Sequence, residues 1–162
     1  MFNIKFSREG AMVYSKQASQ ILGKNYWYLR DDVKVRIEFK SLVWSFIIPQ
    51  GYLTDGATVP RLAWSIVPLW DECTNAVLLH DYLCNYSVTS TDGELYPLNR
   101  ENIDLLFLRT MEFYGVHWFK RKLMYGCVRL WAKLFKYEKP MISTKKYEME
   151  EMIRENIRLG YY

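Results

Sequence analysis

Three polar residues near the middle of the chain have the types and spacing of a catalytic His-Asp site: His80, Asp81 and Asp104. His80 lies four residues after Ala76 and four before Cys84, so an α-helix would place it on an apolar stripe rather than in water. An imidazole held at one nitrogen by a carboxylate can accept a proton from water at the other nitrogen. The sequence therefore predicts His80 as a general base that Asp104 orients.

Asp104 belongs to a second segment with helical periodicity. It falls between Ile103 and Phe107, with Arg100 one turn before it and Met111 two turns after it. This is the inward side of a helix, where a carboxylate must be paired, hydrogen-bonded or bound to a cation. Residue type and periodicity leave a second interpretation open, namely a buried polar network that fixes the register of the helices.

The loop from Thr54 to Thr58, with the sequence TDGAT, is the second candidate. Asp55 and Gly56 form a turn-forming pair, and Thr58 is placed to cap a following helix. Carboxylate and carbonyl oxygens are also the ligands that calcium prefers. The sequence therefore allows either a capping loop or a calcium site made by Asp55 together with Asp81.

The strands that position these residues are expected in the first third of the chain. Segments 26–30, 33–39 and 42–48 are rich in β-branched and aromatic residues, and the second alternates apolar with charged residues. This pattern predicts an antiparallel sheet with one buried face. Asp31 and Asp32 are expected to form a hairpin turn between the first two strands.

The rest of the chain is predicted to be helical, in the segments 71–86, 99–114, 117–136 and 144–159. Asn99 is the expected N-cap of the second helix and Gly115 its stop signal. The fold class is therefore α+β, a small N-terminal antiparallel β-sheet followed by a bundle of three to four helices. Residues 1–140 are expected to form a single α+β domain, and residues 141–162 a charged C-terminal helical arm.

The composition limits the class of protein. The chain has 162 residues, of which half are apolar or aromatic and 25% are charged, so one globular domain is expected. The net charge of +4 is small, and no nucleic-acid-binding motif accompanies it, which disfavours nucleic acid as a partner. Aromatic residues make up 17% of the chain and basic residues gather in 117–136, which favours a peripheral contact with a membrane.

Cysteine usage and the N-terminus indicate a protein made as a soluble chain in a reducing compartment. The three cysteines form no CxxC pair. The first ten residues contain no apolar signal region, so no signal peptide is expected. No apolar run approaches the roughly 18 residues that a bilayer span needs, so no transmembrane segment is expected either.

Two of these segments carry motifs that resemble a family widespread in tailed bacteriophages, known only as a domain of unknown function. The motifs are TDGAT-x-P within residues 51–60 and HDYL within 79–83, followed by the Arg-Asp-Phe-Met pattern of 100–116. The likeness covers roughly residues 40–130. It implies a phage or prophage origin, phage virion proteins as partners, and the host cytoplasm or the virion as the location.

The order of the polar residues is also similar to the two-helix active site of calcium-dependent phospholipase A2. This resemblance implies that His80 is the base for a water, that Asp81 binds calcium and that Asp104 orients the histidine. The loop around Asp55 would complete the calcium site. The supporting residues would be Thr54, Gly56, Thr58, Cys84 and Arg100.

The function predicted from these residues is a metal-assisted hydrolase, phospholipase-like, which uses calcium and acts on a lipid or other ester. The alternative is a non-catalytic virion or host-interaction protein, in which the His-Asp-Asp set is a buried structural network. A nucleophile pair of Cys84 and His80 is a further alternative, because the cysteine lies one helical turn away.

Overall fold

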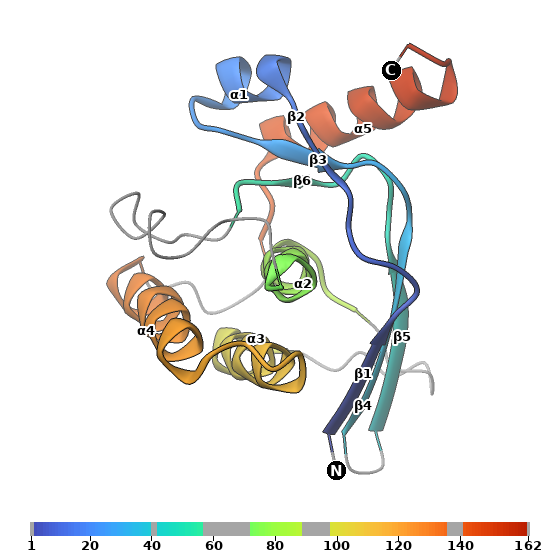
Figure 1. Ribbon diagram of the computed structural model, residues 1–162. Helices are drawn as coiled ribbons and strands as arrows, with labels where there is room; N and C mark the ends of the chain where they lie inside the picture. The colour runs from blue at the N-terminus through green and yellow to red at the C-terminus, as the bar shows by residue number, and fades with distance from the viewer. Residues whose placement is uncertain (1, 40–41, 57–71, 89–97, 136–140, 162) are drawn as a thin grey trace.

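The computed structural model describes residues 2–39, 42–56, 72–88, 98–135 and 141–161, and every structural statement below concerns these ranges. The fold is α+β, as the sequence predicts, with the strands in the first third of the chain and most of the helices after them (Figure 1). In chain order the elements are β1 (Phe2–Phe6), β2 (Met12–Tyr14), α1 (Lys16–Leu22), β3 (Trp27–Leu29), β4 (Val33–Phe39), β5 (Leu42–Ile48), β6 (Leu53–Thr54), α2 (Thr74–Asn85), α3 (Arg100–Phe113), α4 (Trp118–Phe135) and α5 (Thr144–Arg158).

The strands form two antiparallel sheets of three strands each, in the orders β1-β4-β5 and β2-β3-β6. β4 and β5 are the two longest strands expected from the sequence, and they pair along their whole length. Along β4, Val33, Val35 and Ile37 are buried, whereas Lys34 and Arg36 are exposed. One face of this sheet therefore packs on the core, as the alternation indicates.

The hairpin expected at Asp31 and Asp32 is not present. The strand predicted at 26–30 is confirmed as β3, but β3 pairs with β2 and β6 and not with β4. At this corner Asp32 Oδ1 instead accepts a hydrogen bond from the backbone N–H of Gln50 at 2.7 Å. A three-residue strand has too little alternation to specify its partner, which is why the pairing of β3 was predicted wrongly. β1, β2 and α1 were not expected from the sequence.

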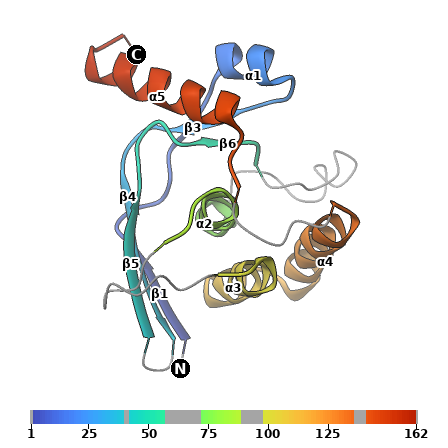
Figure 2. The same ribbon diagram turned by 180° about the vertical axis from the view of Figure 1, so that it is seen from behind.

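α2 runs through the middle of the molecule, with the β1-β4-β5 sheet on one side and α3 next to it, and α3 also contacts β1 (Figures 1 and 2). Leu78, Leu79 and Leu83 pack in the cluster that contains the sheet residues. Ala76 and Val77 pack in a second cluster with residues of α3 and α4. Because α2 is buried on both flanks, any polar side chain on it needs a partner from a neighbouring element.

α3 and α4 are confirmed near their predicted ends. The side chain of Asn99 caps α3 by accepting from the backbone N–H of Asn102 at 2.9 Å, and Gly115 follows the helix with a φ of 72°. α4 lies beyond α3, at the edge of the molecule and away from the β1-β4-β5 sheet (Figures 1 and 2). Within the described ranges, no helix combines the length and apolar character that a membrane span requires.

α5 packs against the second sheet. Its Met149 and Ile153 are buried in a cluster with Tyr26, Tyr28 and Leu53. This contact holds α5 on the molecule through an apolar face, although the sequence of the helix is highly charged. The domain boundary at residue 140 stays a prediction.

Candidate functional site

His80 and Asp104 meet across the contact between α2 and α3. Both side chains are buried, and His80 Nε2 lies 2.7 Å from Asp104 Oδ1. At this distance the ring N–H donates a short hydrogen bond to the carboxylate. The ring of Phe107 covers the imidazole, with 4.8 Å between the ring centroids. The structure therefore brings the two residues together, with Nε2 bound to Asp104 and Nδ1 directed elsewhere.

Asp104 also accepts from two arginines. Arg100 Nε lies 2.8 Å from its Oδ1, and Arg129 Nη1 lies 3.3 Å from its Oδ2. Burial alone would raise the pKa of Asp104, but the hydrogen bond from His80 and the charges of His80 and Arg100 hold it below its usual value. The carboxylate is therefore ionised, and it joins α2, α3 and α4 at one point.

Asp81 lies on the open side of the imidazole. Its side chain is 12% exposed, and its Oδ1 lies 3.5 Å from His80 Nδ1. The hydroxyl of Thr54 on β6 donates to its Oδ2, and the same hydroxyl accepts from the backbone N–H of Gly56 at 3.0 Å. Burial opposes ionisation of Asp81, yet the hydrogen bonds from His80 and Thr54 and the charge of His80 keep its pKa below the usual value.

The pKa of His80 follows from these neighbours. Burial alone would lower it, but the Cys84 sulfur and the carboxylates of Asp104 and Asp81 outweigh burial and raise it well above 6.5. The two carboxylates therefore favour the cationic form of His80. The neutral imidazole that a general base requires forms only at more alkaline pH.

This shift makes the stability of the protein depend on pH. Because the pKa of His80 is raised in the folded state, its contribution to stability is complete below about 6.5 and is lost as pH rises through the folded pKa. We expect the difference in unfolding free energy between wild type and His80→Gln to shrink from about pH 6 to pH 9. Urea unfolding at a series of pH values measures it, and a difference that stays constant or grows would contradict the assignment.

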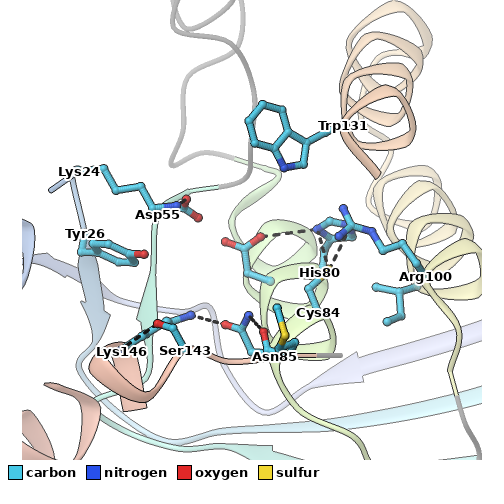
Figure 3. A pocket seen from close by; sticks show the side chains of 13 residues that line it. Lys24, Tyr26, Asp55, His80, Cys84, Asn85, Arg100, Trp131, Ser143 and Lys146 are labelled. Atoms are coloured by element: carbon cyan, nitrogen blue, oxygen red, sulfur yellow. Dashed lines mark hydrogen bonds and ion pairs between the residues drawn. The ribbon is translucent and has the colours of Figure 1, made fainter. Parts of the chain in front are cut away.

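A pocket of about 270 Å³ opens beside His80. Figure 3 shows Lys24 and Asp55 on one side of it, Asn85 and Ser143 on another, and Trp131 across from them, while His80 lies near Arg100. Its lining comes from α2, α3, α4, α5 and residues 24–26, 55 and 141–143: Lys24, Tyr26, Asp55, His80, Asp81, Cys84, Asn85, Arg100, Ile103, Trp131, Met141, Ser143 and Lys146. The sequence indicated His80, Asp81, Asp55, Cys84 and Arg100 but not the remainder.

Lys146 is the main residue of this pocket that the sequence did not single out. Its side chain is buried, its ammonium donates to Asn85 Oδ1, and it lies 4.7 Å from the centroid of the Tyr52 ring. Burial lowers its pKa, although the negative charges of Glu150 and Asp81 oppose the change. A lysine in a charged helix reads as a surface residue, so only its place in the fold identifies it.

Cys84 lines the same pocket, but its geometry does not favour a nucleophile pair. Its Sγ is 4.0 Å from His80 Nδ1 and 3.8 Å from His80 Nε2. A thiol aimed at one lone pair in the ring plane would be much farther from the other nitrogen, so the sulfur faces the ring rather than either nitrogen. Nε2 is in addition occupied by Asp104.

The expected calcium ligands are separated by other contacts. Asp55 forms an ion pair with Lys24, and Asp81 accepts from Thr54 beside His80. Over the described part of the chain, no three His, Cys, Asp or Glu side chains group as a metal site. These donors do not by themselves fit calcium, which takes six to eight oxygens. Calcium binding stays a prediction, and Thr58 with the helix expected after it lies outside the described residues.

The fold and site define an α+β protein with a buried His-Asp pair beside a polar pocket. Residues 27–128 match the family model described as a protein of unknown function, DUF1353, and the chain belongs to that family. No curated protein and no solved structure matches it significantly. His80, Asp81 and Asp104 lie within the matched segment, whereas Trp131 and Lys146 lie beyond it.

Proposed function

We propose that the pocket hydrolyses an ester and that His80 is the general base that activates water. The observation that carries the proposal is the orientation of the imidazole. Its Nε2 is bound to Asp104 at 2.7 Å, whereas its Nδ1 lies 3.5 Å from Asp81, which lines the pocket. A general base needs one ring nitrogen held and the other within reach of the reacting water.

The reaction runs in two steps. A water gives its proton to Nδ1 of neutral His80, and its oxygen bonds to the carbonyl carbon, so that the carbonyl electron pair moves onto oxygen. The tetrahedral intermediate then collapses, the bond to the alkoxide breaks, and the alkoxide takes the proton from Nδ1. The buried Asp104 holds the ring through both steps and stabilises its cationic form.

The charges in the pocket suit the oxyanion of this intermediate. Lys24, Arg100 and Lys146 line the pocket, and fixed cations stabilise negative charge that develops in a partly desolvated site. Asp55 and Asp81 are the opposing charges in the lining. We propose that the ammonium of Lys146 is the main electrostatic support, because it is buried at the pocket wall rather than exposed like that of Lys24.

A panel of substrates tests the proposal. Short-chain aryl esters and a phospholipid are offered to the wild-type protein with and without calcium, because the sequence predicts a lipid or other ester and a calcium requirement. Hydrolysis of any of them by wild type, lost in His80→Gln, is the expected result. A protein that hydrolyses none of them, or one that loses nothing in His80→Gln, would overturn the proposal.

The acid limb of kcat/KM is expected above pH 6.5, because the base is neutral His80 and its pKa is raised. Asp81→Asn removes one of the carboxylates that raise this pKa, so the limb should move toward lower pH. Rates measured across the pH range for both proteins check this. A limb at the same pH in the variant would contradict the role given to Asp81.

One observation favours the alternative function. Asp104 accepts from groups on three helices, an arrangement that suits a buried network fixing the fold. The chain would then be a non-catalytic phage virion or host-interaction protein. In that case His80→Gln would change stability and partner binding, and the ester panel would show no turnover by wild type.

A further inference from the structure

α4 carries exposed apolar side chains on its outward side. Trp118, Phe119, Leu130 and Leu134 are between 52% and 66% exposed. Leu130 follows Phe119 by 11 residues, and Leu134 follows Leu130 by four. These spacings place the three side chains close to one line along the helix. Figures 1 and 2 both show α4 at the edge of the molecule, on the far side of α3 from the sheet. The exposed side chains therefore form a face rather than scattered positions.

The charges of α4 divide between its two sides. The helix contains five basic residues and no acidic residue. Lys122 and Lys133 are exposed, and neither forms an ion pair within the ranges that the structure describes. The other three pair with acids at 3.3 to 3.4 Å: Lys120 with Glu72, Arg121 with Glu112 and Arg129 with Asp104.

We call the outward side the α4 outer face, defined by Trp118, Phe119, Lys122, Leu130, Lys133 and Leu134. We propose that the α4 outer face binds an anionic lipid bilayer, with the apolar side chains inserted at the headgroup boundary and the lysines on the headgroups. Aromatic and leucine side chains next to exposed lysines are the chemistry that such a surface recognises. Two copies of the chain meeting through this face would bring like charges together, which disfavours a symmetric dimer as the occupant.

The position of Trp131 connects this face to the pocket. Trp131 belongs to α4 and lines the pocket beside His80 (Figure 3). A bilayer bound along α4 would therefore lie close to the pocket. A bilayer this close would supply the pocket with an ester of a membrane lipid as its substrate class. This assignment of the substrate rests on the proposed hydrolase function.

Co-sedimentation with vesicles tests the face directly. We expect the full chain to bind vesicles that contain phosphatidylserine in phosphatidylcholine, and to bind pure phosphatidylcholine weakly. Added salt should weaken the binding. The double variant Leu130→Glu/Leu134→Glu should lower the affinity by roughly tenfold or more, because it places acidic groups against an anionic surface. The matched control is Ile21→Glu, an apolar residue on α1, beside α5, that is also more than half exposed.

The outcomes separate this inference from the proposed function. His80→Gln should bind vesicles like wild type, and Leu130→Glu/Leu134→Glu should hydrolyse a water-soluble ester like wild type. Absent or equal binding to both vesicle types would overturn the inference, as would a double variant that binds like Ile21→Glu. Self-association in ultracentrifugation that the double variant abolishes, without vesicle binding, would overturn it in favour of an interface between copies.

Discussion

Replacement of Asp104 by alanine is expected to reduce the unfolding free energy by about 3–5 kcal/mol. The reason is that three cationic donors would lose their common acceptor. His80, Arg100 and Arg129 all direct N–H groups at this buried carboxylate. Removing the carboxylate leaves the buried His80 and the two largely buried arginines without their shared acceptor, which is more unfavourable than the loss of one hydrogen bond. Urea unfolding at neutral pH measures the change.

Glu101→Ala is the matched control on the same helix. Glu101 is 73% exposed at its side chain and lies 3.6 Å from Arg129, so its loss should change stability by about 1 kcal/mol or less. If Asp104→Ala changed stability no more than Glu101→Ala, the network would not stabilise the fold as described. Asp104 is also a poor residue for testing catalysis, because its loss would affect stability and turnover together.

The second large effect concerns turnover. His80→Gln is expected to lower kcat/KM for an ester substrate by roughly 10²- to 10⁴-fold, the usual contribution of a general base. Glutamine retains an N–H group that can reach Asp104 but has no nitrogen that accepts a proton. Most of the activity should therefore be lost while the protein stays folded. Steady-state rates above pH 6.5, where the neutral imidazole of the proposed base is expected to form, give the comparison.

His117→Gln is the control for this change, since the chain has only two histidines. His117 is exposed and its ring lies 5.8 Å from that of Trp118, outside the pocket lining. Its replacement should leave kcat/KM within about twofold of wild type. Equal losses in the two variants would show that the effect does not come from the His80 site.

The sequence was sufficient for the elements with strong periodicity. Alternation in 33–39 indicated β4, and the placement of Asn99 and Gly115 indicated the ends of α3. The contact of His80 with Asp104 followed from two inward polar residues on successive helices, because each needed a partner. These are local patterns whose consequences reach only the neighbouring element.

Contacts between elements that are distant in the sequence could not be predicted from such local patterns. Arg129 bonds to Asp104 from α4, and Lys146 reaches the pocket from α5, yet both are long basic side chains in helices that read as solvated. The partners of β3 were missed for a related reason. Its three residues pair with β2 and β6, and neither the length nor the alternation of β3 specifies them.

The most direct test of the central claim is whether turnover depends on the pKa of His80 itself. NMR titration of the His80 ring, with His117 as the only other histidine signal, is compared with the acid limb of kcat/KM in the same buffer. We predict that the two pKa values coincide above 6.5 and fall together in Asp81→Asn. A ring that titrates at or below 6.5, or a limb that does not follow it, would contradict the claim that His80 is the base.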